Sequence, residues 1–254
     1  AALPLLAAAT PRRAAAPPLL AAVLAVALAC WGVAVNRSGP DQPRVAHLAY
    51  VLDSGRGTWV SADAAPHPWA AARVPTMPAS WEGPMPYGSR PARTGPAPAV
   101  KAPAPELTIL DERREGDLLV LRLRARSLRG AYQIGLHTDA DVRGGTIEAP
   151  GLPPVPLPRH GRYTGAWPYE LQFFAPPASG VEIELRVGGT ARPRLAVTDL
   201  TLGLDGIPGH LPRPKDVDLA PFDGGLPTDS VTVVGTPAGG AYDARPGAGH
   251  TISR

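Results

Sequence analysis

The chain has 254 residues with 33 prolines and 28 glycines, a composition that predicts many turns and sheet edges around a modest core. Its net charge is +3, and without Arg12 and Arg13 it is +1, a near balance that excludes the basic footprint of a nucleic-acid-binding protein. The single cysteine, Cys30, excludes an intrachain disulfide.

An uncharged run from Ala14 to Val35 directly follows Arg12 and Arg13. A helix of this length would measure about 33 Å, enough to cross the hydrocarbon core of a bilayer. We therefore predict one transmembrane helix over residues 14–35, with Pro17 and Pro18 in its first turn, where a missing N–H costs little. A cleaved export signal and the buried helix of a soluble protein are the alternatives.

The sequence around this run predicts its orientation in the membrane. Residues 1–10 are already apolar, so we interpret residues 1–13 as the end of a preceding hydrophobic segment and a short cytoplasmic loop. The positive-inside rule keeps Arg12 and Arg13 in the cytoplasm and places everything after Asn36 on the extracytoplasmic side. Membrane lipid is then the first partner that we expect.

Residues 36–105 are predicted to form a β-hairpin followed by a proline-rich wrap and linker. Strand-forming residues flank the turn DSGRG between Arg44 and Ala62, as expected of a hairpin. The segment PWAAARV allows at most two helical turns. From residue 74 to 105 the prolines oppose a continuous ladder and favour extended or irregular backbone.

Residues 106–235 show the alternation of half-buried antiparallel strands. From Leu119 to Arg126, leucine and alanine alternate with Val120 and then with three arginines, and apolar residues alternate with glutamate and arginine from Val181 to Val187. Further strands are expected at residues 106–110, 131–137, 145–148, 170–174, 194–202 and 230–234. The fold class is therefore predicted to be mainly β, an antiparallel β-sandwich-like domain, with residues 236–254 as a flexible tail.

Few residues fit a metal site or a catalytic site. His137 and Asp139 have the spacing of two metal ligands but no third ligand nearby, so we interpret them as a strand end and its turn. Asp216, Asp218 and Asp223 resemble part of a calcium loop whose pattern is broken by Lys215 and Pro221, which favours a solvated loop. We predict no catalytic, cofactor-binding or metal-binding residue in this chain.

Three other patterns have a structural and a functional interpretation. The sequon Asn36–Ser38 would lie against the bilayer, where glycosylation is hindered. The stripe Arg122, Arg124 and Arg126 is expected to pair with Glu182 and Glu184 on a solvated sheet face, with an envelope-polymer site as the alternative. Four tryptophans are expected in the core rather than as sugar-binding platforms, namely Trp59, Trp69, Trp81 and Trp167.

Several short motifs occur together in one order along the chain. They are LAYVLDSGRGTWVSA at residues 48–62 with Trp69 after it, SLRGA at 127–131, GLDGIPG at 203–209, PRP at 212–214 and DSVTVV at 229–234. This set resembles the carboxy-terminal region of membrane-embedded zinc aminopeptidase-like proteins of the endoplasmic-reticulum metallopeptidase and vacuolar membrane protease type, in a bacterial version. Asp205 departs from the proline that the family pattern leads us to expect.

The resemblance implies a particular organisation. In that family a two-zinc peptidase domain precedes the transmembrane helices, and a β-rich domain follows the last helix. The zinc ligands belong to the earlier domain, and no residue of this chain matches them. The resemblance thus implies a noncatalytic anchor and extracytoplasmic β-domain of a zinc metallopeptidase, with the upstream peptidase domain and its helices as partners and zinc held there.

Two other functions remain open from the sequence. The chain would also suit a free-standing membrane-anchored β-module that binds cell-envelope polymer or protein through its arginines and tryptophans. A third interpretation is the accessory outer domain of a multispanning transferase.

Overall fold

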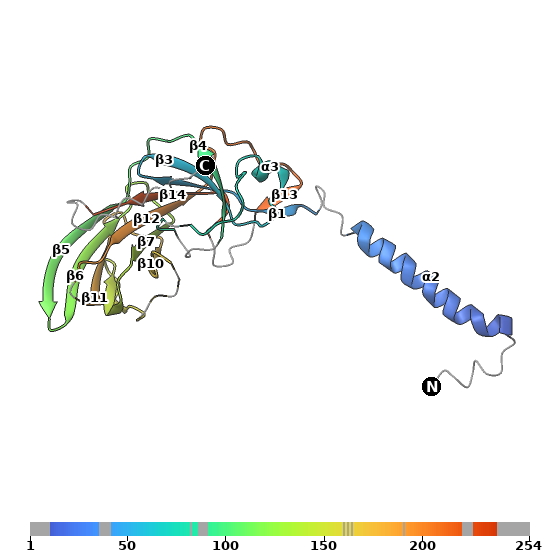
Figure 1. Cartoon of the computed structure of the whole chain (residues 1–254), viewed down its shortest axis with the longest axis horizontal. Helices are drawn as coiled ribbons and strands as arrows, with labels where there is room; N and C mark the ends of the chain where they lie inside the picture. Colours follow the sequence, from blue (N-terminus) through green and yellow to red (C-terminus); the bar gives the residue numbers. More distant parts are fainter. Residues whose placement is uncertain are drawn as a thin grey trace, which may run out of the picture. The chain divides into compact units, whose positions relative to one another are not determined.

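The computed structural model describes residues 11–35, 42–81, 83–85, 91–159, 161, 163, 165–189, 191–219 and 226–237. It divides into two compact units, residues 1–44 with 215–218 and residues 45–214 with 219–254. Figure 1 labels those elements of both units for which the view has room.

The first unit contains the helix α2 (Pro11–Val35). It starts earlier than predicted, because Pro11 suits a first helical position and the arginines and alanines after it favour helix. Our placement of Pro17 and Pro18 in the first turn was therefore wrong, since they lie further inside α2. The window Pro18–Val35 has a mean hydropathy of 2.4 and none of it is buried, which suits a membrane span or a signal sequence and argues against a buried helix.

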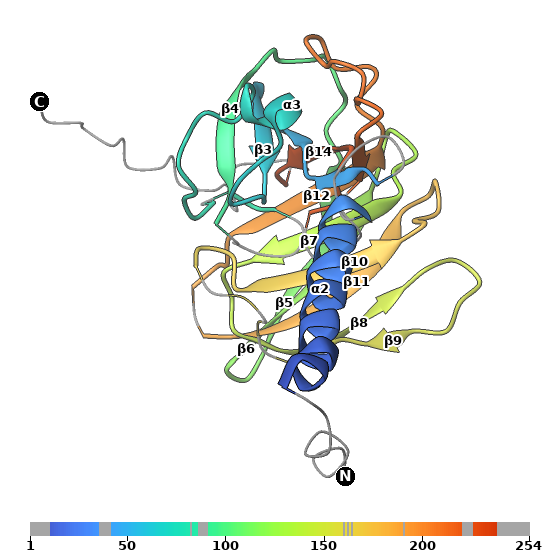
Figure 2. The same cartoon turned by 90° about the vertical axis from the view of Figure 1, so that its right-hand side faces the viewer.

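The second unit contains a seven-stranded sheet in the order β10-β7-β12-β14-β2-β3-β4. Figure 2 shows these strands following one another across the unit. The pairs are antiparallel except for β14 with β2, which is parallel. The strands are β2 (Ala49–Asp53), β3 (Arg56–Ser61), β4 (Arg93–Ala97), β7 (Gln133–Thr138), β10 (Tyr169–Phe174), β12 (Leu195–Leu202) and β14 (Ser230–Gly235).

A five-stranded antiparallel sheet has the order β5-β6-β11-β8-β9. Its strands are β5 (Glu106–Glu115), β6 (Leu118–Arg126), β8 (Val142–Glu148), β9 (Val155–Pro156) and β11 (Val181–Gly188). The short strands β1 (Arg44–Ala46) and β13 (Val217–Leu219) form a further pair. The one-turn helix α3 (Pro68–Ala71) follows β3.

The largest hydrophobic cluster draws buried side chains from both sheets. It includes Leu121 of β6 and Leu185 of β11 from one sheet, and Leu136 of β7 and Val197 of β12 from the other. A second cluster covers part of the seven-stranded sheet, where Met85 and Ala92 pack with Val51 of β2 and other strand residues. The apolar residues of the alternating strands therefore lie in the core, as predicted. The prediction of a mainly β fold is confirmed.

The predicted hairpin is confirmed as β2 and β3, with Ser54 and Gly55 at positive φ in its turn. Within residues 74–105, where the prolines were expected to oppose a continuous ladder, the strand β4 pairs with β3 over five residues, a strand that the sequence did not predict. Pro96 is tolerated because β4 is an edge strand. A residue of an edge strand whose N–H would point away from the sheet can be proline without the loss of a hydrogen bond between strands. The seven-stranded sheet thus contains strands from both predicted segments, 36–105 and 106–235.

Candidate functional site

The solvent-facing side of β6 and β11 carries the predicted arginine stripe, which we call the arginine face (Arg122, Arg124, Arg126, Glu182 and Glu184). Antiparallel register sets Glu182 opposite Arg124 and Glu184 opposite Arg122. The two oxygens of Glu182 accept hydrogen bonds from Arg122 and Arg124, each with an N–O distance of 2.6 Å. These two bonds hold the pKa of Glu182 below its ordinary value. The predicted pairing of the stripe with Glu182 is therefore confirmed.

The register alone would pair Glu184 with Arg122 of the stripe. The carboxylate of Glu184 instead pairs with arginines outside the stripe. Its carboxylate lies 3.3 Å from the guanidinium of Arg113 on β5 and 3.0 Å from that of Arg186 on its own strand. Arg126 reaches Glu106 at 3.7 Å and donates to the carbonyl oxygen of Ala178. Each arginine of the stripe thus has an acceptor on a neighbouring element.

A hollow of about 430 Å³ lies on the arginine face. It is lined by Arg122, Arg124, Glu148, Ala149, Pro150, Ser179, Gly180 and Glu182. Its two guanidinium groups are balanced by the carboxylates of Glu148 and Glu182, which are register partners on β8 and β11. An acidic polymer would meet no excess of positive charge here, and the side chains suit a solvated, self-paired face.

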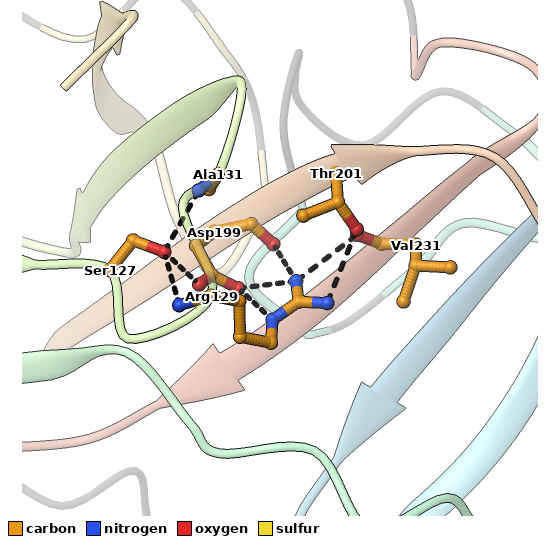
Figure 3. Close-up of polar contacts among 6 residues, drawn as sticks. All are labelled: Ser127, Arg129, Ala131, Asp199, Thr201 and Val231. Carbon is orange, nitrogen blue, oxygen red and sulfur yellow. Dashed lines mark hydrogen bonds and ion pairs between the residues drawn. The ribbon is translucent and has the colours of Figure 1, made fainter. Parts of the chain in front are cut away.

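The SLRGA segment forms a buried polar network with β12 and β14 (Figure 3). The guanidinium of Arg129 donates to Asp199 Oδ1 at 2.6 Å and to Thr201 Oγ1 at 3.2 Å. Only 13% of the Arg129 side chain and none of the Asp199 side chain is exposed. The carbonyl oxygens of Asp199 and Val231, 3.3 Å and 3.4 Å from Arg129, are further acceptors.

Ser127 completes this network. Its hydroxyl donates to Asp199 Oδ2 at 2.7 Å and accepts the backbone N–H groups of Arg129 and Ala131, both at 3.2 Å. Gly130, between them, has a φ of 64°, which few other residues adopt without strain. Because its proton and its lone pairs are engaged, Ser127 is positioned as a structural clamp and not as a nucleophile.

The interpretation of His137 and Asp139 as a strand end and its turn is confirmed, because His137 lies in β7 and Asp139 follows its last residue. His137 is 1% exposed, and its Nε2 lies 2.9 Å from Thr198 Oγ1 on the neighbouring strand. Burial lowers the pKa of His137 to about 3. Asp139, in the turn, accepts from the Arg194 side chain at 2.8 Å and from its backbone N–H at 2.7 Å. Each side chain therefore has its own structural partner.

The second candidate metal site, Asp216, Asp218 and Asp223, lies only partly within the described residues. Asp216 and Asp218 flank the first residue of β13, and Asp223 and the sequon Asn36–Ser38 lie outside the described residues. Within the described part of the chain, no group of three or more His, Cys, Asp or Glu side chains is arranged to hold a metal ion.

Three of the four tryptophans are buried, as predicted. Trp59, Trp69 and Trp167 are 3%, 8% and 7% exposed, and Trp81 packs at the edge of the second cluster. Arg73 stacks 5.9 Å from the centre of the Trp59 ring and donates to Gly209 O at 3.0 Å. The GLDGIPG segment is held in this way beside a hollow of about 400 Å³.

His47 has a structural role that the sequence did not indicate. The N–H of Ala62 donates to its Nδ1 at 3.1 Å, so the ring proton sits on Nε2 and is donated to Leu226 O at 2.6 Å. The ring thereby ties the end of β3 to the segment before β14. No local signal reveals this, because Leu226 is far away in the sequence.

No family model, curated protein or solved structure matches this chain.

Proposed function

We propose that this chain is the membrane anchor and noncatalytic extracytoplasmic β-domain of a zinc-dependent, aminopeptidase-like membrane metallopeptidase. The observation that carries the proposal is the apolar window Pro18–Val35, wholly exposed, followed by a β-rich unit. Exposed apolar surface of that length is unfavourable in water and favourable in a bilayer. The family comes from the motif resemblance, and the helix and the sheets agree with the organisation that it implies.

The contacts of the most promising polar residues support a noncatalytic role. Ser127 is saturated by Asp199 and two backbone N–H groups, and His137 is buried against Thr198. A nucleophile or a general base needs a free lone pair at a place that substrate reaches. In this proposal the two zinc ions and the hydrolytic chemistry belong to the peptidase domain, and the β-domain packs against it or shapes access to it.

We further propose that the two larger sheets pack face to face as a β-sandwich. The support is the shared cluster, in which Leu121 and Leu185 of one sheet join Leu136 and Val197 of the other. Facing sheets bury one row of every strand, which agrees with the alternating burial along β6 and β11.

The alternative of an envelope-polymer receptor is less well supported. Its predicted binding surface is the arginine face. The arginines there already have a carboxylate partner, because Glu182 accepts hydrogen bonds from both Arg122 and Arg124. An acidic polymer would have to break these ion pairs and replace them with similar ion pairs of its own, so the net gain in binding free energy would be small.

Alkaline carbonate extraction of membranes from cells that express the chain tests the anchor. We expect the chain to stay in the pellet, and the variant L24R/L28R to be released, because each arginine costs about 2.5–3.5 kcal/mol at a helix centre. The matched control L152R/L211R places the same charges at exposed positions of the β-rich unit and should stay in the pellet. Release of the unaltered chain, or an intact mass that lacks α2, would contradict the proposal.

Labelling of intact cells tests the side of the membrane. In a C30A background, the exposed Ser179 is changed to cysteine and treated with a membrane-impermeant maleimide. An extracytoplasmic domain is labelled without permeabilisation. Labelling that requires permeabilisation would place the β-domain in the cytoplasm.

Zinc content and aminopeptidase turnover test the catalytic assignment. The chain alone should hold no stoichiometric zinc and hydrolyse no aminoacyl substrate, and a version extended upstream should do both. Turnover by the chain alone, or an upstream coding sequence without a peptidase domain, would refute the assignment.

A further inference from the structure

Arg73 follows the one-turn helix α3, and the fold fixes its position from two sides. Its backbone N–H donates to the carbonyl oxygen of Ala70 at 2.9 Å. Gly95 of β4 lets this segment lie against the sheet, because a Cβ at Gly95 would overlap the carbonyl oxygen of Arg73. The guanidinium lies 5.9 Å from the centre of the Trp59 ring on β3. The side chain of Arg73 is therefore held beside the edge of the seven-stranded sheet.

The guanidinium of Arg73 has no carboxylate partner among the described residues. Its Nε and Nη2 share the carbonyl oxygen of Gly209 at 3.3 Å and 3.0 Å, and its Nη1 donates to that of Trp69 at 2.8 Å. These bonds leave one N–H on each of the two terminal nitrogens. Other arginines of the same unit do contact a carboxylate, as Arg129 and Arg194 show. Burial lowers the pKa of Arg73 below its ordinary value, and no carboxylate offsets this effect.

The hollow of about 400 Å³ beside the GLDGIPG segment opens next to this guanidinium. Its volume falls within the range of about 300–1,000 Å³ that is usual for small-molecule sites. Arg73 is the only charged residue among the described residues that line it. The apolar lining consists of Trp59, Ala72, Pro75, Pro96 and Leu211. The hollow thus combines one positive charge with apolar walls.

The charge and the walls together define the chemistry of a ligand. The two oxygens of a carboxylate can accept the two remaining N–H groups of Arg73. A doubly charged phosphate would keep a negative charge without a partner, because no second cation lines the hollow. Leu211 is 57% exposed, so an apolar group beside the carboxylate would cover surface that now faces water. A singly charged acid with an apolar group therefore fits better than a phosphate or a neutral molecule.

We propose that this hollow binds a small monocarboxylic acid, whose carboxylate pairs with Arg73 and whose apolar group lies against Pro75, Pro96 and Leu211. The ligand supplies the negative charge that Arg73 lacks within the chain. A free aliphatic acid and the last residue of a short peptide share this chemistry. The site involves neither the arginine face nor an upstream peptidase domain, so its test is independent of the proposed function.

Isothermal titration calorimetry of the full-length chain in detergent tests the ligand class. N-acetyl-L-leucine carries a carboxylate and an apolar group, and N-acetyl-L-leucinamide is its neutral counterpart. We expect the acid to bind with a dissociation constant of about 1 mM or lower, and the amide to bind about 10-fold more weakly or worse. Phenyl phosphate, which is largely doubly charged at neutral pH, should also bind more weakly than the acid.

A second acid distinguishes the two sources of the carboxylate. 4-Methylpentanoate has the same apolar group as N-acetyl-L-leucine but no amide. Binding at least as tight as that of N-acetyl-L-leucine supports a free aliphatic acid as the ligand, and weaker binding supports the end of a peptide. Both results support the monocarboxylate site, provided that the amide binds more weakly than either acid.

Two variants connect the binding to this hollow. R73M should lose the preference for the acid over the amide, because it removes the charge and keeps a long apolar side chain. L211E should weaken binding of the acid by about 10-fold or more, because it brings a negative charge to the wall. The matched control L152E makes the same change at a leucine that is 58% exposed and does not line the hollow, and it should bind as the wild type does.

Circular dichroism and thermal unfolding establish that each variant is folded. Absence of saturable binding of both acids, equal affinities for acid and amide, or an acid preference that persists in folded R73M would overturn the proposal. Equal loss of binding in L211E and L152E would overturn it as well. Should R73M fail to fold, the two leucine variants and the acid–amide pair still decide the question.

Discussion

Two arginine–carboxylate contacts of equal length occupy different environments in this protein. Arg129 meets Asp199 with an N–O distance of 2.6 Å, and Arg122 meets Glu182 at the same distance. The side chains of Asp199 and Arg129 are 0% and 13% exposed, whereas those of Glu182 and Arg122 are 29% and 55% exposed. Distance alone therefore does not reveal how much each pair matters.

The comparison shows that burial decides the cost of breaking an ion pair. Water replaces a lost partner at the arginine face, so an exposed pair contributes about 0–1 kcal/mol. Water cannot reach Asp199, so loss of Arg129 leaves a carboxylate that is desolvated and uncompensated. The buried pair is a requirement of the fold rather than a large gain in stability, since forming it also costs the desolvation of two charges.

The largest expected effect follows from replacing Arg129 with methionine. We expect R129M to lower the free energy of unfolding by about 3–5 kcal/mol, because Asp199 then keeps only the Ser127 hydroxyl as a charge-stabilising donor. Urea unfolding followed by tryptophan fluorescence measures the change. The double variant R129M/D199L should recover part of the loss, because it removes the unpaired charge. A loss below 1 kcal/mol in R129M would show that water reaches the network.

A buried group whose pKa is shifted by burial alone extends the comparison of the two ion pairs. This group is His137, and the pH dependence of unfolding measures its effect. The pKa of His137 is lowered to about 3, below its ordinary 6.5, because burial opposes the charged imidazolium. The unfolded chain takes up the proton first as pH falls, so this stability is complete above pH 6.5 and declines toward pH 3. Between pH 6.5 and 4.5 we expect a loss of about 2–3 kcal/mol from this residue.

The variant H137Q isolates this contribution from that of the carboxylates. It should have a flatter stability profile than the wild type over the same pH interval, measured by urea unfolding at each pH. Parallel profiles would mean that His137 is protonated in the folded protein, contrary to its burial against Thr198.

Removing the Ser127 hydroxyl should have an intermediate effect. S127A leaves the Arg129–Asp199 pair in place but removes one donor to Asp199 and the acceptor for two backbone N–H groups. We expect a loss of about 1–3 kcal/mol in the free energy of unfolding, the usual cost of unsatisfied buried groups. S179A, at an exposed serine, serves as the control and should change stability by less than about 0.5 kcal/mol. Equal losses in the two variants would contradict the clamp.

Local periodicity explains what the sequence could predict of the fold. Leu121, Leu123 and Ala125 alternate with arginines, and this period of two predicted both the strand and its buried face. The apolar helix was predictable from length and composition in the same way. Arg122 and Arg124 were expected to meet Glu182, because strands with complementary charges often become neighbours.

The remaining features depend on contacts between distant segments. Arg129 lies in a loop with no periodic signal, and Asp199 lies 70 residues away on β12, so no window of sequence shows that they meet. β4 was missed because Pro96 argues against a central strand, although proline is allowed in an edge strand. The local sequence pattern does not show which strands are neighbours, so the edge position of β4 could not be predicted. The short motifs did mark SLRGA, which proved to hold a buried network.

The smallest effect, and the sharpest test of the comparison, is expected at the arginine face. R122M should lower the free energy of unfolding by no more than about 1 kcal/mol, because Glu182 keeps Arg124 and water can solvate it. Raising the salt concentration to about 1 M should remove most of this difference by screening, while the effect of R129M should persist. If R122M matched R129M in size and in insensitivity to salt, the arginine face would be shielded from water, and burial would no longer distinguish the two pairs.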